Sequence, residues 1–252
     1  MMNASKAPSP STINEEEIEK FSALAAEWWN PRGPMAPLHK LNPARLSYIR
    51  DAVCAHFGRD QGQMRPLKGL LALDVGCGAG LVTESLARMG AEATGLDASL
   101  DAIAAARVHA EESGLSVTYH ADSVENLSAT GAQFDLITAL EVVEHVADVD
   151  LFLGGLARLL KPGGLLVFST PNRTPQSYVS VIFAAEKVLK WVPEGTHDWK
   201  AFLTPDELTQ RLDQAGLIVT DLKGLHYSLI NRTFAVTSDT SINYIGSARH
   251  KG

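Results

Sequence analysis

The stretch Leu73-Asp74-Val75-Gly76-Cys77-Gly78-Ala79-Gly80 decides the fold class of this chain. A short apolar run ends in alternating glycines, and a helical pattern follows directly. Glycine lets the backbone pass close beneath a ligand, and a helix N-terminus presents unpaired N–H groups to it. Leu81 stands where the dinucleotide fingerprint G-x-G-x-x-G requires its last glycine. The stretch therefore predicts a strand–turn–helix unit that binds a ligand other than a standard dinucleotide.

From Leu70 onward, short apolar runs alternate with segments of helical periodicity. The expected strands are Leu70–Val75, Ala91–Leu96, Val117–His120, Phe134–Leu140 and Leu165–Thr170. The expected helices between and after them are Leu81–Met89, Ser99–Ser113, Asp148–Leu160 and one capped by Thr204. Two last strands are expected at about Leu217–Leu225 and Ile242–Arg249. The alternation predicts an α/β fold with a mostly parallel, seven-stranded sheet covered by helices on both faces and finished by an antiparallel pair.

Two further helical patterns precede the first strand. Asn14 is placed to cap a helix that runs to Trp28, with Glu17 at the reciprocal capping position. A second helix is expected to start at Asn42-Pro43, with the proline at its first position. The chain is therefore expected to divide into a flexible tail over 1–12, a helical cap over 13–60, and an α/β domain over 61–252 with an insertion at about 171–200.

The composition excludes several classes of protein. With 252 residues, 45% hydrophobic and 20% charged, the chain is neither collagen, coiled coil nor wholly disordered. A formal net charge of −7 makes nucleic acid an unsuitable partner. Cys54 and Cys77 are too few for a disulfide framework, which favours a reduced, cytoplasmic protein. No apolar run reaches the ~18 residues of a transmembrane helix.

Acidic residues at strand ends add to the glycine loop. Asp97 closes the second strand, where its carboxylate can accept hydrogen bonds from both hydroxyls of a ribose, and Asp122 is placed for an adenine amino group. Together with Asp74, Asp135 and the turn Lys161-Pro162-Gly163-Gly164, this set resembles the class I S-adenosylmethionine-dependent methyltransferases. The resemblance covers about residues 70–170. It implies a Rossmann-like fold and S-adenosylmethionine as cofactor. A nucleotide-sugar or NAD enzyme is the alternative.

In that family the loop holds the methionine moiety of the cofactor. The implied cofactor-binding positions in the loop are Gly76, Gly78 and Gly80, with Asp74 at the strand end before it.

The segment Leu140-Glu141-Val142-Val143-Glu144-His145 follows the fourth strand at the edge where α/β sheets bind ligands. Glu141, Glu144 and His145 share one face of a helical turn, and this donor set suits Mg²⁺ or Mn²⁺. A cation would lower the pKa of a phenol, which is otherwise near ~10. The same side chains are also candidates for a general base without metal, or for structural residues that pack over the cofactor.

Several flanking segments carry a closer resemblance. They are Glu27-Trp28-Trp29, the run from Pro37 to Leu46, Ser169-Thr170-Pro171-Asn172-Arg173, Gly195-Thr196-His197-Asp198-Trp199 and Gly224-Leu225-His226-Tyr227. Together they resemble the ubiquinone-biosynthesis O-methyltransferases, from about Ile18 to Tyr244.

This closer resemblance implies O-methylation of polyprenylated catechol-type intermediates, at the 2-polyprenyl-6-hydroxyphenol and 3-demethylubiquinol steps, and membership of a biosynthetic complex is a further expectation. It also implies cofactor contacts at Arg45, Gly76, Asp97 and Leu140. Mg²⁺ at Glu141, Glu144 and His145 is implied by the eukaryotic relatives. A guanidinium such as Arg45 can hold the methionine carboxylate bidentately, although an exposed arginine on an amphipathic helix is the commoner role.

The insertion suits a lipophilic substrate. Residues 177–191 are apolar with charges near the end, and a helix of ~15 residues is about 22 Å long, too short to span a bilayer. Lying in an interface, it would contact a prenyl tail or the inner face of the cytoplasmic membrane. A helix buried on the sheet is the alternative. His197 and Asp198 are candidates for headgroup contacts, or for a hydrogen bond within their own loop.

Two other functions remain open at this point. One is a methyltransferase of a soluble small-molecule acceptor. The other is a non-catalytic S-adenosylmethionine-binding scaffold, against which Glu141, Glu144 and His145 argue, because a scaffold has no chemical need for them.

Overall fold

The computed structural model describes residues 11–179, 199–228 and 232–252. The helical elements are α1 (Glu15–Ser22), η1 (Ala25–Glu27), α2 (Ala36–Phe57), α3 (Leu81–Arg88), α4 (Leu100–Glu112), α5 (Val124–Ala129), η2 (Val143–His145), α6 (Val149–Leu159), α7 (Pro175–Ser177), η4 (Trp199–Ala201) and α8 (Pro205–Gln214). The strands are β1 (Leu71–Val75), β2 (Glu92–Asp97), β3 (Thr118–Ala121), β4 (Phe134–Leu140), β5 (Leu160–Pro171), β6 (Leu217–Ser228), β7 (Thr233–Thr237) and β8 (Asn243–His250).

All of these strands join one sheet in the order β3-β2-β1-β4-β5-β8-β6-β7. The first five are mutually parallel, and β8 runs antiparallel between β5 and β6. This confirms the mostly parallel α/β sheet and its closing antiparallel pair. The predicted count of seven strands is wrong by one, because β7 also pairs with the end of β6. A five-residue edge strand with partly exposed side chains gives little apolar signal in a sequence.

The connection from β3 to β4 fixes where a ligand can bind. The chain runs outward from β1 through β2 to β3 and then returns to place β4 on the other side of β1. The loops after β1 and β4 therefore leave the sheet in opposite directions, which opens a crevice at the carboxyl ends of these two strands. The glycine loop follows β1, and Glu141 follows β4.

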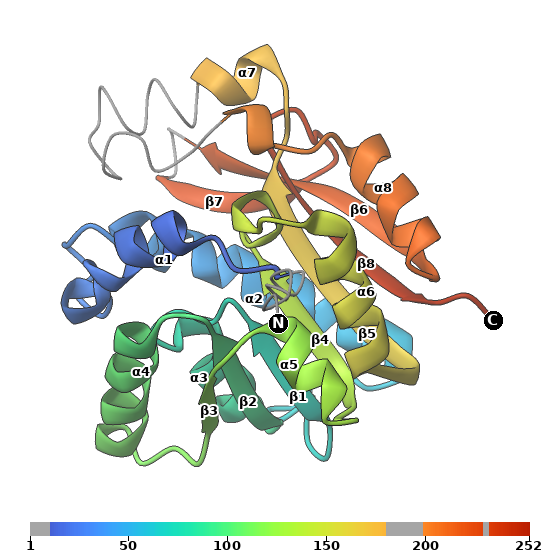
Figure 1. The fold of residues 1–252 in the computed structure, drawn as a ribbon. Helices are drawn as coiled ribbons and strands as arrows, with labels where there is room; N and C mark the ends of the chain where they lie inside the picture. Colours follow the sequence, from blue (N-terminus) through green and yellow to red (C-terminus); the bar gives the residue numbers. More distant parts are fainter. Residues whose placement is uncertain (1–10, 180–198, 229–231) are drawn as a thin grey trace, which may run out of the picture.

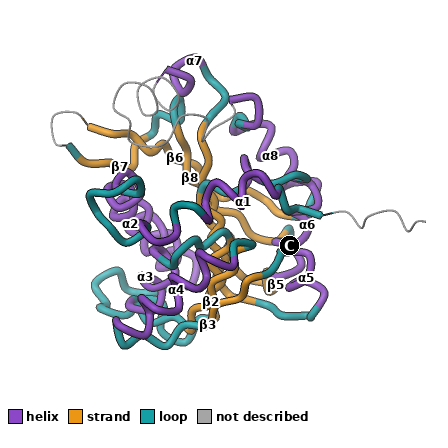
Figure 2. Tube along the Cα trace, turned by 60° about the vertical axis from the view of Figure 1, so that its left-hand side comes forward, coloured by secondary structure: helices purple, strands orange, loops and turns teal. Residues whose placement is uncertain are grey.

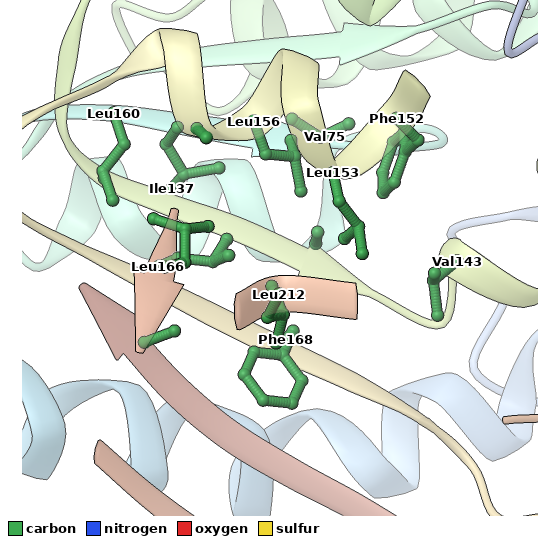
Figure 3. Close-up of a cluster of buried hydrophobic side chains, with 14 of the residues drawn as sticks. Val75, Ile137, Val143, Phe152, Leu153, Leu156, Leu160, Leu166, Phe168 and Leu212 are labelled. Carbon is green, nitrogen blue, oxygen red and sulfur yellow. The ribbon is translucent and has the colours of Figure 1, made fainter. Parts of the chain in front are cut away.

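Helices cover both faces of the sheet (Figure 1). The α5, α6 and α8 helices pack on one face, and α2, α3 and α4 on the other. Figure 2 shows the strands running between these two helical layers. Figure 3 shows the core of the first face, where Phe152, Leu153 and Leu156 of α6 and Leu212 of α8 point toward the strands. The apolar runs read from the sequence are thus buried on both sides.

The N-terminal helices differ from their predicted limits. The first ends at Ser22 rather than at Trp28, and its N-cap Asn14 makes no side-chain capping bond. The second begins at Ala36, and Pro43 lies inside it. It continues through the proline because residues on both sides of Pro43, including Leu41 and Ile49, are buried against the sheet.

The expected helical cap therefore divides between two roles. The α2 helix forms part of the layer that covers the sheet, whereas α1 and the two residues that flank η1, Leu24 and Trp28, line the cavity described below. We call residues 12–29 the N-terminal arm. At the end of the expected tail over 1–12, Ser11 and Thr12 donate hydrogen bonds to the carboxylate of Glu125. The backbone oxygen of Thr12 also accepts from Ala147 N at 3.0 Å.

Much of the insertion lies outside the described residues. The expected interfacial helix over 177–191 is described only to residue 179, and His197 and Asp198 are not described. In the described ranges, no helix combines the length and the apolar character needed to cross a membrane.

Two adjacent glycines of α6 give a matched test of the packing of α6 on α5. A Cβ at Gly155 would lie 2.4 Å from Val124 Cγ1 of α5, whereas a Cβ at Gly154 would meet, among the described residues, only Arg158 Nη1, at 3.8 Å. We expect Gly155→Ala to lower the free energy of unfolding by about 1–3 kcal/mol through overpacking. Gly154→Ala should raise it by about 0.5–1 kcal/mol through helix propensity. Urea unfolding midpoints measure both, and equal shifts of the same sign would contradict the α5–α6 contact.

Candidate active site

A cavity of about 610 Å³ opens at the carboxyl ends of β1 and β4. Its walls come from the N-terminal arm, α2, the glycine loop, the ends of β2 and β4, and the facing ends of β6, β7 and β8. It brings together most of the predicted site residues, namely Arg45, Asp74, Gly76, Gly78, Asp97, Asp122, Leu140, Glu141 and His145. Gly80 and Glu144 do not line it. A second cavity, between α2 and the β6–β8 strands, contains none of the predicted residues.

Side chains from two neighbouring elements pack closely on the glycine loop. Gly76, Gly78 and Gly80 have positive φ angles of 66°, 52° and 90°, which disfavour other residues. A Cβ at Gly76 would lie 2.3 Å from Val142 Cγ2, and one at Gly80 would lie 2.2 Å from the Tyr119 hydroxyl oxygen. Gly80 therefore serves the packing of the loop on β3, and it does not line the cavity as Gly76 and Gly78 do.

Asp74, at the end of β1 just before the glycine loop, is buried and hydrogen-bonded to α3 and β4. Its Oδ2 accepts from the Thr83 hydroxyl of α3 at 2.6 Å, and its Oδ1 accepts from the Thr138 hydroxyl of β4 at 2.7 Å. The residue is 3% exposed, and burial raises the pKa of Asp74 to about 6 against the opposing hydroxyls and the charge of Arg45. Both oxygens are thus used within the fold, so that Asp74 positions the site.

Asp97 and Asp122 present carboxylates on the β2 and β3 side of the cavity. Asp97 accepts from Gly78 N and Ser99 N, each at 2.8 Å, and burial still raises the pKa of Asp97. Asp122 accepts through Oδ1 from Ser123 N and from the Asn126 side chain. Each carboxylate oxygen has a second lone pair, so both side chains can still accept hydrogen bonds from a ligand.

Arg45 and Glu141 face each other on the β4 side. Arg45 is 3% exposed, and its Nη2 lies 3.2 Å from Glu141 Oε1. Within the described residues, its Nε and Nη2 are buried without a hydrogen-bond partner. Glu141 has a φ of 56° and also accepts from the Ser169 hydroxyl and the Asn243 amide. A buried guanidinium with unused donors is suited to an anionic ligand group.

Glu144 is buried at 7% exposure beneath the cavity wall. Its Oε2 accepts from the Thr170 hydroxyl at 2.9 Å, and among the described residues its Oε1 has no hydrogen-bond partner. Burial, together with the negative charge of Glu141, raises the pKa of Glu144 to about 7. Burial and the neighbouring carboxylate thus both disfavour the charged form of Glu144.

His145 is oriented by a residue whose role the sequence did not reveal. Its Nδ1 lies 2.7 Å from Oε2 of Glu17, which comes from α1, and its ring meets that of Phe21 edge-on at 5.3 Å. Burial alone would lower the pKa of His145, but the Glu17 hydrogen bond and the charges of Glu144, Glu17 and Glu141 raise it. The same hydrogen bond lowers the pKa of Glu17 to about 2. Glu17 therefore binds His145 instead of forming the predicted capping box.

The three residues predicted to hold a metal point to different partners. Glu141 contacts Arg45, Ser169 and Asn243, whereas the Nδ1 of His145 faces Glu17. The His145 Nε2 lies 3.9 Å from Glu144 Oε1. Across the described ranges, no group of three or more His, Cys, Asp or Glu side chains is arranged to hold a metal ion. The predicted metal set is thus not formed, because two of its three members are engaged in other contacts.

Comparisons with known proteins agree with this fold. Residues 73–168 match the family model of a methyltransferase domain. The magnesium protoporphyrin IX methyltransferase ChlM from Synechocystis PCC 6803, solved with bound SAH, has a TM-score of 0.62 at 18% identity, over 94% of this chain and 96% of that one. The PH0226 protein from Pyrococcus horikoshii OT3 has a TM-score of 0.63 at 15% identity, over 92% and 98%. The chain thus has the Rossmann-like fold of S-adenosylmethionine-dependent methyltransferases.

Closer relatives narrow this class. A ubiquinone biosynthesis O-methyltransferase of Sinorhizobium fredii (strain NBRC 101917 / NGR234) is 48% identical over 234 residues, 93% of this chain and 94% of that protein. One from Chelativorans sp. (strain BNC1) is 50% identical over 93% of this chain and 92% of that protein. One from Nitrobacter winogradskyi is 48% identical over 99% and 95%. This chain belongs to the ubiquinone biosynthesis O-methyltransferase family.

The buried Asp74 carboxyl gives a pH-dependent prediction. The pKa of Asp74 in the folded chain, about 6, lies above its ordinary value in the unfolded chain. Proton binding to Asp74 therefore stabilises the fold fully when the pH is below that ordinary value. This stabilisation is lost as the pH rises through about 6. The free energy of unfolding of Asp74→Asn, relative to that of the unaltered chain, should therefore increase by on the order of 2 kcal/mol when the pH rises from about 4.5 to about 7.5. Urea unfolding at both pH values tests this, and a difference that does not change with pH would contradict it.

Proposed function

We propose that this chain transfers the methyl group of S-adenosylmethionine to a phenolic oxygen of polyprenylated catechol-type intermediates of ubiquinone biosynthesis. The observation that carries the proposal is family membership along nearly the whole chain, at about 48% identity. The cavity supports it, because acidic, cationic and proton-accepting side chains meet there on opposite walls. The substrate is the polyprenylated phenol or quinol that the family acts on.

The cavity residues fit the cofactor. Arg45 has buried, unused N–H donors that suit the carboxylate of the methionine moiety, and Gly76 and Gly78 let the backbone approach it closely. Asp97 is suited to the ribose hydroxyls and Asp122 to the adenine amino group. Leu140, 8% exposed, supplies an apolar wall. When bound, S-adenosylmethionine supplies an electrophilic methyl group on a positively charged sulfur.

His145 is our candidate for the proton acceptor. A phenol has a pKa near ~10, so removal of its proton at neutral pH makes the oxygen a stronger nucleophile. On this proposal the imidazole of His145, which Glu17 orients through Nδ1, takes the phenol proton. Glu144 and Glu141 stabilise the resulting imidazolium, and most of the acceleration comes from positioning of the acceptor.

The proposed mechanism invokes no divalent metal, and the described side chains of Glu141, Glu144 and His145 are not arranged as a ligand set. The cytoplasmic location, a peripheral contact of 177–191 with the inner face of the membrane, and membership of a biosynthetic complex remain proposals. At the described start of that segment, Tyr178 and Val179 are 48% and 56% exposed, which is compatible with an apolar partner.

Methyl transfer from labelled S-adenosylmethionine to a short-chain prenylated catechol tests the proposed function directly. We expect turnover, and we expect it to persist in excess EDTA. Turnover that EDTA abolishes and Mg²⁺ restores would overturn the metal-free mechanism and return Glu141, Glu144 and His145 to metal binding. Activity only on soluble phenols would favour the small-molecule alternative. Cofactor binding without turnover on any catechol would favour the scaffold.

Variants of the proton acceptor and its partner separate catalysis from binding in the same assay. We expect His145→Gln to lower kcat by about 100-fold or more, as for the loss of a general base. Glu17→Gln should lower kcat by about tenfold, through the loss of one charged hydrogen bond. Cofactor affinity should hardly change in either variant. An unchanged kcat in His145→Gln would remove this residue from the mechanism.

A further inference from the structure

Two consecutive tryptophans of the N-terminal arm, Trp28 and Trp29, lie on the glycine loop, and the mechanism above uses neither. Trp28 is 7% exposed and lines the cavity. A Cβ at Gly78 would lie 2.1 Å from its Cζ2 and 2.6 Å from its Cη2. The space that any other residue would need at position 78 is thus filled by the Trp28 indole, which lies directly on the turn of the loop.

Trp29 anchors the arm to the outer side of the same loop. Its indole Nε1 donates to the backbone oxygen of Ala79 at 2.9 Å. Its ring stacks on that of His109 from α4, with centroids 3.4 Å apart and planes within 5°. Trp28 therefore contacts Gly78 from the cavity wall, and Trp29 contacts the next residue of the same loop, Ala79, from the other side.

His109, on which Trp29 stacks, is itself hydrogen-bonded to a residue in the interior of the domain. His109 Nδ1 lies 2.6 Å from Oε1 of Glu84, a fully buried residue of α3. The other oxygen of Glu84 accepts from Arg88 at 2.9 Å. The backbone oxygen of Trp28 is also 2.9 Å from the His39 ring. The contacts of the two tryptophans thus reach α2, α3 and α4, the helices that carry the cofactor side of the cavity.

We infer that Trp28 and Trp29 form an aromatic clasp that closes the N-terminal arm over the glycine loop, retains the bound cofactor and controls its release. In this role Trp28 is a cofactor-contact residue, and Trp29 with His109 are positioning residues that hold it in place. A ligand at Gly76 and Gly78 lies against the Trp28 side of the cavity, so the clasp must open for it to exchange. The inference rests on the proposed cofactor, but not on the identity of the acceptor.

Intrinsic fluorescence gives a direct readout, because the chain has four tryptophans. S-adenosylhomocysteine added to the full-length protein should change the emission, and Trp28→Phe should remove most of that change. Trp199→Phe is the matched control. Its indole donates to Thr174 O, away from the cavity, so the change should persist in this variant. A signal that survives in Trp28→Phe and disappears in Trp199→Phe would overturn the inference.

Stopped-flow displacement of S-adenosylhomocysteine then tests the anchor. We expect Trp29→Ala to release this ligand faster and to raise its Kd by about tenfold, the effect of losing one hydrogen bond and one stacked ring. If Trp29→Ala fails to fold, His109→Ala removes the stack and the bond to Glu84 but keeps the Trp29 hydrogen bond to Ala79, and it should also speed release. Unchanged release in the folded variants would overturn the clasp. Failure of the unaltered chain to bind the ligand would instead contradict the proposed function.

Discussion

The buried carboxylate of Asp74 is the constraint on which the site depends. It stands at the end of β1 and accepts hydrogen bonds from Thr83 of α3 and Thr138 of β4. These bonds hold together the three elements that diverge at the crevice, and the glycine loop begins two residues later. A carboxylate kept in an apolar interior is costly unless it is hydrogen-bonded, so the two hydroxyls are as necessary as the acid itself. The ladder between β1 and β4 already fixes the distance between the two strands, and the Asp74 bonds add the start of α3 to that pair.

The N-terminal arm supplies site residues in addition to those that come from the sheet. The sheet provides Asp97, Asp122 and the β4 segment, while α1 brings Glu17 to His145 at 2.7 Å. The same arm places Trp28 on Gly78, at the cofactor side of the cavity. One segment of the chain thus lines both the cofactor side and the acceptor side of the cavity.

The sequence predicted best what short-range patterns determine. The β4 strand lies at its predicted limits, Phe134–Leu140, because a mostly apolar run of this length is favoured at the centre of a parallel sheet. The start of α2 was mispredicted, because Asn42-Pro43 has the local form of a helix start, and only burial on the sheet carries the helix through it. Glu17 was assigned a local capping role, since its partner His145 is 128 positions away. Long-range pairs of this kind leave no periodic signal in a single sequence.

On our inference, the arm and the glycine loop close together over a cofactor at the carboxyl ends of β1 and β4. Amide hydrogen exchange of the full-length protein, with and without S-adenosylhomocysteine, measures this closure. We expect slower exchange on ligand binding in two segments, residues 76–81 and the arm over 15–29, with no change in α8. Protection confined to the glycine loop, with exchange in the arm unaltered, would contradict it.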